Sequence, residues 1–203
     1  MITTLLVIRH GQTDSNISGY YMGWSQEGLN EKGYEQVKLL SDRLSNVPID
    51  IIYSSPLKRA LSTADAVAEP HGLAPVAIDD LIEINLGDWQ ELHAGEIIKK
   101  WPDMWQQSRV DPSGLVWPNG ESFAQAAERS VRAFDSILKA NRGKIVAVVT
   151  HDIIVRIMAM HVLGVVYSTY RRMEISNASF TKIVVMDDNK QLITLNDTSH
   201  LGY

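Results

Sequence analysis

Two arginines and two histidines carry the clearest chemical signal in this chain. Arg9 and His10 are adjacent, and Arg59 and His151 likewise follow apolar segments. Guanidinium groups form charge-assisted, often bidentate hydrogen bonds with phosphate oxygens. Nearby positive charge lowers the pKa of an imidazole, and a neutral imidazole is a nucleophile. The set therefore predicts a positive, anion-binding pocket in which His10 attacks phosphorus in line while the arginines stabilise the equatorial oxygens.

Three short apolar runs would bring these residues together. The runs 4–8, 49–53 and 145–149 are rich in β-branched residues, and each ends in polar residues, which is typical of buried strands. In open α/β sheets, ligands bind beyond the carboxyl ends of the strands. We therefore expect Arg9, His10, Arg59 and His151 to converge at one edge of a sheet, where the following helices add backbone N–H donors.

Helical segments alternate with these strands. Asn30 is a suitable N-cap for a helix that begins at Glu31, Pro56 fits the first turn of the next helix, and Ser122 and Gln125 form a capping-box pattern before a long helix. A further helix is expected over 153–163, and the segments 181–186 and 191–195 read as a hairpin. The pattern predicts a three-layer α/β/α fold with a mostly parallel sheet and an antiparallel edge hairpin.

Two stretches are less regular. Residues 9–30 are rich in Gly, Ser and Asn and are expected to form a loop. Residues 83–121 hold four of the five tryptophans, with a short helix expected over 94–100. We interpret residues 1–203 as a single domain with an inserted, lid-like segment at about 83–121. Its tryptophans are either core filler or a lid that excludes water and limits substrate size.

Composition excludes several classes of protein. The 203 residues carry a formal charge of −5 and no cysteine, so disulfides, thiolate zinc sites, iron–sulfur clusters and cysteine nucleophiles are ruled out. The acidic balance argues against nucleic acid as a partner, and no apolar run is long enough for a membrane helix. The amino terminus has no basic region before its short apolar run, so we expect no signal peptide, no membrane partner and a cytoplasmic location.

Six segments together resemble the histidine phosphatase superfamily, which includes the cofactor-dependent phosphoglycerate mutases. They occur in the order of that family's motifs and span nearly the whole chain. The segments are Leu6–Thr13 with Asn16, Ser54–Ala64, Leu81–Trp89, Pro118–Ser122, Val149–His151 and Asn196–Leu201.

The resemblance implies a role for each matching residue. His10 would be the phosphorylated nucleophile, Arg9 and Arg59 would hold the phosphoryl group, and His151 would donate a further hydrogen bond to it. Glu83 would be the general acid that protonates the leaving oxygen and then helps to activate water.

Four further residues are expected to bind substrate. The resemblance implies that Asn16 contacts the transferred phosphate, and Thr13 belongs to the same motif. Trp24 is expected to help select the substrate, as is His200 if the tail folds over the pocket and does not fray.

The sequence departs from the family pattern at two positions. Asp152 follows His151 where many members have glycine, and Asn119 replaces a glycine often found before the long helix. A carboxylate at 152 would cap the helix and keep His151 protonated, or would repel an acidic substrate.

The function expected is hydrolysis of a phosphomonoester on a small phosphorylated metabolite through a phosphohistidine, without metal or cofactor. This is the reaction of a histidine acid-type phosphatase. The chain is short for the insertions typical of the mutases, which favours a phosphatase. A phosphoglycerate mutase-type phosphoryl transferase, a catalytically silent phosphate-binding module and, more distantly, a zinc hydrolase built on His10 and His151 are the alternatives. The sequence allows a homo-oligomer.

Overall fold

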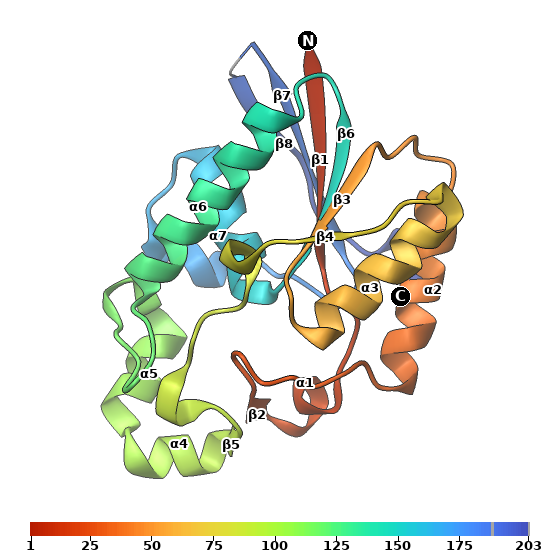
Figure 1. Cartoon of the computed structure of the whole chain (residues 1–203). Coiled ribbons are helices and arrows are strands. Elements are labelled where there is room, and N and C mark those ends of the chain that lie inside the picture. Colours follow the sequence, from red (N-terminus) through yellow and green to blue (C-terminus); the bar gives the residue numbers. More distant parts are fainter. Residues whose placement is uncertain (188, 203) are drawn as a thin grey trace.

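The centre of the molecule is a six-stranded sheet with the order β4-β3-β6-β1-β7-β8 (Figure 1). The computed structural model describes residues 1–187 and 189–202. The strands are β1 (Ile2–Arg9), β3 (Ile51–Ser54), β4 (Val76–Ala77), β6 (Ile145–Thr150), β7 (Phe180–Met186) and β8 (Asn189–Asp197). β4, β3, β6 and β1 run parallel, whereas β7 pairs antiparallel with β1 and β8 antiparallel with β7. The predicted mostly parallel sheet with an antiparallel edge hairpin is confirmed.

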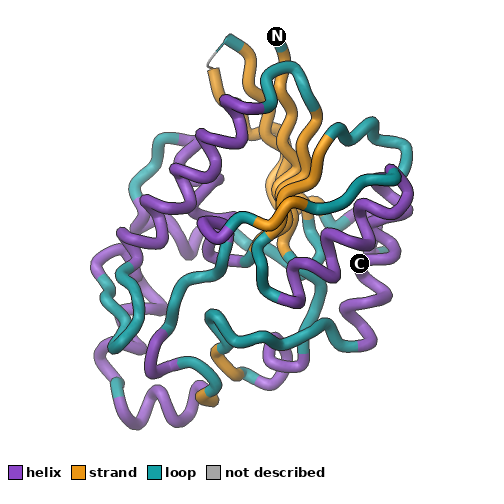
Figure 2. Tube along the Cα trace, in the orientation of Figure 1, coloured by secondary structure: helices purple, strands orange, loops and turns teal. Residues whose placement is uncertain are grey.

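Helices cover both faces of this sheet, as Figure 2 shows in purple around the orange strands. On one side lie α2 (Glu31–Leu44) and α3 (Lys58–Ala68), and on the other lie α6 (Phe123–Ala140) and α7 (Asp152–Leu163). Successive side chains of a strand point to opposite faces. Accordingly Leu5 and Val7 of β1 belong to the core beneath α6 and α7, while Leu6 and Ile8 belong to the core beneath α2 and α3. The apolar runs are therefore central strands buried on both faces.

The predicted helix starts are largely observed. Asn30 Oδ1 accepts a hydrogen bond from Gly33 N at 2.8 Å, and Ser122 Oγ accepts one from Gln125 N at 3.1 Å. The interpretation of Pro56 is wrong, because α3 begins at Lys58 with Leu57 as its N-cap residue. Pro56 therefore precedes the helix and does not belong to its first turn.

The segment 9–30 is more structured than a loop. It contains α1 (Asp14–Ser18) and β2 (Tyr20–Tyr21), and β2 pairs with β5 (Leu92–His93) in a separate two-stranded sheet. Two residues a strand are too few to give a periodicity in the sequence. This small sheet fastens the segment after β1 to the segment 83–121.

Residues 83–121 form mainly short helices at the lower left of Figure 1. The predicted helix is present as α4 (Ala94–Lys100), and α5 (Pro102–Val110), which was not predicted, follows it directly. The 3-10 helices along the chain are Glu69–His71, Asp79–Leu81, Gly87–Trp89, Pro112–Gly114, Tyr167–Arg172 and Ser199–Leu201. The single-domain division with an insertion here stays a prediction.

The tryptophans of this segment pack around Trp89, whose side chain is fully buried. The ring centroids of Trp101, Trp105 and Trp117 lie 6.3, 6.3 and 6.2 Å from that of Trp89. Aromatic pairs at such separations stabilise a core beyond the area they bury. The packing favours the core interpretation of these rings, and a moving lid stays a prediction. No helix within the described residues is both long and apolar enough to cross a membrane.

A glycine allows two segments of the backbone to approach each other closely beside the carboxyl end of β1. A Cβ atom on Gly33, in the first turn of α2, would stand 2.1 Å from the carbonyl oxygen of Gln12. Only glycine therefore lets the chain that follows β1 lie against the start of α2. This contact holds the residues directly after His10 against the rest of the fold.

Candidate active site

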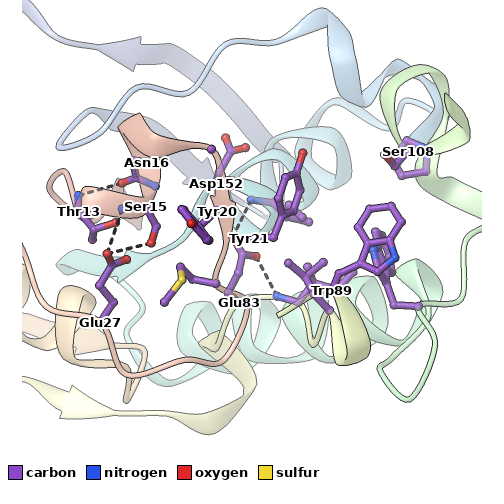
Figure 3. Close-up of a pocket in the computed structure, with 18 of the residues that line it drawn as sticks. Thr13, Ser15, Asn16, Tyr20, Tyr21, Glu27, Glu83, Trp89, Ser108 and Asp152 are labelled. Carbon is purple, nitrogen blue, oxygen red and sulfur yellow. Dashed lines mark hydrogen bonds between the residues drawn. The ribbon is translucent and has the colours of Figure 1, made fainter. Parts of the chain in front are cut away.

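A cavity of about 380 Å³ lies beyond the carboxyl ends of β1, β3 and β6. Its walls include Arg9, His10, Arg59 and Glu83, which come from three segments far apart in the sequence. Figure 3 shows the cavity as elongated, with Thr13, Asn16 and Glu27 at one end, Trp89 and Ser108 at the other, and Glu83 between them. The volume is at the small end of the range for ligand pockets, which fits a small metabolite.

His10 is fixed where β1 ends. Its backbone N donates to Thr150 O at 3.0 Å, and its carbonyl accepts from Ala178 N at 3.1 Å. In the ring, Nδ1 lies 2.7 Å from Gly11 O, so Nδ1 carries the proton and Nε2 keeps its lone pair. The pKa of His10 is lowered well below its usual value by burial, and then by Arg59 and Arg9. The imidazole is thus a neutral base whose Nε2 is available as a nucleophile.

Arg59 is held against His10 by the loop after β2. Its Nε donates to His10 Nε2 at 3.2 Å, while Nη1 and Nη2 donate to Ser25 O and Gly23 O at 2.8 and 2.7 Å. The side chain is buried, with 3% of its surface exposed. The guanidinium is therefore oriented before any ligand arrives, which reduces the entropy lost when an anion binds.

Arg9 leaves one donor without a partner. Its Nη1 donates to Ile175 O at 2.6 Å, but its buried Nε has no hydrogen-bond acceptor within residues 1–187 and 189–202. A buried N–H without an acceptor costs free energy of about 1–3 kcal/mol. A phosphoryl oxygen beside His10 would supply the missing acceptor.

His151 is not part of the cavity wall, but its ring contacts that of His10 and it repeats this pattern. The two imidazole centroids are 5.1 Å apart, and His151 is fully buried. Its Nε2 lies 2.8 Å from Ser55 Oγ, whereas its buried Nδ1 has no partner in the described part of the chain. If the Ser55 hydroxyl donates to Nε2, the proton of the neutral ring resides on Nδ1, which then becomes the second unpaired donor of the site.

Ser55 is the partner of His151: its hydroxyl contacts the His151 ring and accepts a hydrogen bond from Leu57 N at 3.3 Å. The pKa of His151 is lowered well below its usual value, first by burial and then by the positive charge of Arg59. The expectation that Asp152 keeps His151 protonated is therefore wrong.

Asp152 forms its hydrogen bond with Arg156. Its Oδ1 accepts from Arg156 Nε at 2.9 Å, one helical turn further along α7, and the N-cap position belongs to His151 and not to Asp152. The carboxylate also lines the cavity, where it helps to raise the pKa of Glu83. Its partner Arg156 compensates much of its charge.

Glu83 faces the cavity from the segment that follows β4. Its Oε1 accepts from Ile84 N at 2.9 Å and its Oε2 from Ile153 N at 3.5 Å (Figure 3). Burial, together with the charge of Asp152, raises the pKa of Glu83 to about 7 despite these N–H donors. A carboxyl group with this pKa can donate a proton near neutral pH and can accept one in the next step.

Arg129, on α6, holds the segment around Glu83 in place through hydrogen bonds. Its guanidinium donates to the carbonyl oxygens of Asp80, Ile82 and Glu83 at 3.0, 2.6 and 2.9 Å. It also forms a salt bridge with Glu121 at 2.6 Å, both side chains being largely buried. Sequence reasoning missed this residue, since an arginine on an amphipathic helix gives no sign of what it contacts.

The other predicted substrate-binding residues fall in different places. Thr13 and Asn16 line the cavity, and Asn16 Oδ1 accepts from Thr13 N and Asn177 Nδ2 at 3.1 and 2.9 Å. Asn177, also missed from sequence, donates to His10 O at 3.2 Å. Trp24 is not part of the cavity wall, but its Nε1 donates to Glu83 O at 2.6 Å.

His200 lies away from the cavity. Its ring stacks on Phe180 at 6.2 Å, and its Nε2 lies 3.0 Å from Ala178 O. The tail folds back onto the body of the protein without reaching the cavity wall, so its placement gives no support to substrate contact by His200.

Asn119 has a conformational explanation. Its φ of 55° lies in the left-handed region, which asparagine tolerates better than most residues. Its Nδ2 donates to both Asp88 carboxylate oxygens, at 3.0 and 3.1 Å. The asparagine therefore preserves the turn where a glycine is common in the family. Among the described residues, no group of three or more His, Asp and Glu side chains is arranged to hold a metal ion.

Known proteins are similar to this chain in both sequence and fold. The family model of the histidine phosphatase superfamily (branch 1) matches residues 5–198. Phosphoserine phosphatase 1 of Hydrogenobacter thermophilus is 33% identical over 98% of this chain and 94% of its own length. The metal-independent phosphoserine phosphatase of Arabidopsis thaliana is 31% identical over 99% of this chain and 84% of its own.

A solved structure is similar over the whole chain. Bacillus stearothermophilus YhfR superposes with a TM-score of 0.94 at 28% identity, covering 98% of this chain and 99% of that one. The fold, the order of the motifs and the family match agree. The chain belongs to the histidine phosphatase superfamily, branch 1.

Proposed function

We propose that this protein is a metal-independent phosphomonoesterase that transfers the phosphoryl group of a small metabolite to His10 and then to water. The observation that carries the proposal is the pair of buried, unpaired nitrogens, Arg9 Nε in the residue before a neutral His10 and His151 Nδ1 in the ring that contacts it. Together with Arg59 they form a site that lacks only an oxyanion. Family membership and relatives named as phosphatases support the same reaction.

The first chemical step is phosphoryl transfer to the imidazole. His10 Nε2 attacks phosphorus in line, and Arg9, Arg59 and His151 donate to the equatorial oxygens. The Nδ1 proton, bonded to Gly11 O at 2.7 Å, fixes the tautomer and stabilises the positive charge that develops on the ring. The bond from phosphorus to the leaving oxygen breaks as the bond to Nε2 forms. Glu83 gives its proton to that oxygen.

The second step returns the enzyme to its initial state. Glu83, now a carboxylate, removes a proton from a water molecule whose oxygen attacks the phosphorus of phosphohistidine. The bond between Nε2 and phosphorus breaks, and inorganic phosphate leaves. A pKa of about 7 suits Glu83 for both proton transfers, because neither form is strongly favoured near neutral pH.

Metal independence is supported by the charges of the site. Two guanidinium groups beside His10 would repel a divalent cation unless carboxylates outnumbered them. Phosphoserine is the first natural substrate to test, since the two curated relatives described above are named for it. A mutase would instead pass the phosphoryl group to a second phosphorylated substrate.

One experiment separates these functions. The purified chain is incubated with phosphoserine, 3-phosphoglycerate and p-nitrophenyl phosphate, with and without a chelator, and free phosphate and 2-phosphoglycerate are measured. A phosphatase releases phosphate in both conditions. Formation of 2-phosphoglycerate would identify a mutase, binding without turnover would indicate a silent phosphate-binding module, and loss of activity with chelator would overturn metal independence.

A further inference from the structure

Two arginines stand at the end of the cavity opposite Asn16 and Glu27. Arg109 is near the end of α5, and Arg171 belongs to the 3-10 helix Tyr167–Arg172; both line the cavity. Arg171 Nη2 donates to Ser108 O at 2.8 Å, which places the pair at the Ser108 end of Figure 3. We call Arg109 and Arg171 the distal arginine pair. The phosphoryl-binding arginines are separate from it.

The distal pair has no anionic partner in the protein. Within the described residues, neither guanidinium lies within 4.0 Å of a carboxylate. The carboxylates that line the cavity are Glu27, Glu83 and Asp152. Glu27 accepts from Ser15 at the opposite end, and Asp152 pairs with Arg156. Both residues are exposed, so water screens much of the repulsion between them, and an oxyanion that enters the cavity would supply the counterion that the described residues do not.

Tyr21 lies close to both arginines. It lies between Glu83 and Ser108 in Figure 3, and it forms a hydrogen bond with Arg109. Burial raises the pKa of Tyr21 despite the charges of Arg109 and Arg171, so the phenol stays uncharged at neutral pH. Tyr21 therefore lies near the arginines without neutralising their charges.

Each guanidinium group of the pair also lies near an aromatic ring. Arg171 Cζ lies 5.0 Å from the centre of the Tyr170 ring, and Arg109 Cζ lies 5.8 Å from that of Trp105. Stacking on an aromatic ring leaves the N–H edge of a guanidinium available for hydrogen bonds in its plane. The cavity wall also includes the apolar residues Ile84, Leu86 and Trp89, and Glu83 lies between its two ends.

We propose that the distal arginine pair binds a second anionic group of the substrate, a carboxylate or a phosphate, while the phosphoryl group to be transferred occupies the opposite end. The inference rests on the proposed function in that His10, Arg9 and Arg59 receive the reacting phosphoryl group. It assigns the natural substrate to phosphomonoesters that carry a further oxyanion, joined to the phosphoryl group through a short linker that passes Glu83.

Phosphonates test this without requiring turnover, because their P–C bond is not hydrolysed. Calorimetry compares 2-amino-4-phosphonobutanoate with 3-aminopropylphosphonate, which lacks only the carboxylate. A second arm compares propane-1,3-bisphosphonate with propylphosphonate. In at least one of the two comparisons, we expect the wild type to bind the ligand that carries the second anion about tenfold more tightly than the ligand that lacks it. The arm that shows the preference identifies the anion as carboxylate or phosphate.

Three single variants and one double variant test whether the distal arginine pair causes this difference in affinity. Arg109→Gln and Arg171→Gln are each expected to reduce the affinity ratio severalfold, and the double variant is expected to bring it near one. Arg172→Gln removes an exposed neighbouring arginine that does not line the cavity, and it should keep the wild-type ratio. The structure records no hydrogen bond from Arg109 to a backbone carbonyl of the described residues. The Arg109→Gln variant therefore tests the site without removing a contact that holds α5 in place.

Two outcomes would overturn the inference. One is a wild-type ratio near one in both arms, and the other is an unchanged ratio in the double variant. Hydrolysis of p-nitrophenyl phosphate by the wild type is measured separately. A chain that shows the arginine-dependent ratio but releases no phosphate would support the second anion site while refuting the proposed phosphatase.

Discussion

The two halves of the cavity are built in different ways. The phosphoryl half takes Arg9 and His10 from the end of β1, beside the buried His151 that follows β6, and the backbones of both strands are hydrogen-bonded to neighbouring strands. The leaving-group half takes Glu83, Arg109 and Arg171 from short helices and irregular segments. There the positions depend on side chains, such as Arg129, that bind backbone carbonyls.

The difference indicates that the two halves of the cavity have different roles in the reaction. Bond formation to phosphorus needs atoms placed within a fraction of an ångström, and central strands of a packed sheet supply that rigidity. The other half determines which molecule enters and when its leaving oxygen is protonated. We therefore expect changes in the phosphoryl half to abolish the reaction on all substrates, and changes in the other half to act according to the substrate.

The largest effect is expected from His10→Ala. Removal of the nucleophile should lower kcat by more than about 10⁴-fold on aryl and alkyl phosphates alike. An acid-labile phosphoenzyme, trapped by rapid quenching of the wild type, should be absent from the variant. His71→Ala, which changes a histidine outside the cavity, is the control. Substantial turnover by His10→Ala would remove the phosphohistidine from the mechanism.

Glu83→Gln should distinguish substrates by their leaving groups. An alkoxide needs a proton as it departs, whereas p-nitrophenolate is stable without one. We expect a loss of about 10²–10⁴-fold in kcat/KM for phosphoserine and a much smaller loss for p-nitrophenyl phosphate. Asp88→Asn, at an exposed carboxylate outside the cavity, serves as the control. Equal losses on both substrates would show that Glu83 is not the general acid.

The pH profile gives an independent view of the same group. The protonated form of Glu83 is the acid, and its pKa is raised to about 7, so its active form is lost as the pH rises through that value. For phosphoserine we expect kcat/KM to fall about tenfold per pH unit above about pH 7. The profile of Glu83→Gln should lack this limb. A limb that persists in Glu83→Gln would assign the titration to another group.

Arg129→Met should reproduce part of the Glu83 effect from a distance. Without the bonds to Asp80 O, Ile82 O and Glu83 O, the carboxyl loses its fixed position. We expect kcat for phosphoserine to fall about tenfold, with a smaller change for p-nitrophenyl phosphate. Arg132→Met on the same helix removes an exposed salt bridge to Asp80 and is the matched control. A stability loss without this substrate dependence would make Arg129 only a structural residue.

Ser55→Ala is expected to have the smallest effect. The variant removes the partner of His151 Nε2 but leaves both catalytic arginines in place. The ring can then adopt either tautomer, so the donor facing the phosphoryl oxygens is present only part of the time. We expect kcat to fall severalfold on both aryl and alkyl phosphates. A Ser55→Thr variant that restores the rate would support the hydroxyl as the positioning group, and a rate unchanged in Ser55→Ala would contradict it.

Much of the phosphoryl half could be predicted from sequence. Arg9, His10, Arg59 and His151 follow apolar runs, and parallel strands bring their carboxyl ends to one edge. Glu83 could not be chosen over other carboxylates from its surroundings in the sequence; only the resemblance to the family selected it. Its raised pKa depends on burial and on Asp152, a residue far along the chain.

The sequence by itself determined the α/β layers and the groups at the strand ends, because strand periodicity and polar residues after a strand are local patterns. Only the tertiary structure decided that Arg129 fastens Glu83, that His200 packs on Phe180, and that Arg109 and Arg171 share a cavity wall. These arrangements join segments distant along the chain through side-chain contacts that leave no periodicity in the sequence. The effect of these charged groups on binding and on pKa values can be judged only when their burial and their neighbours are known.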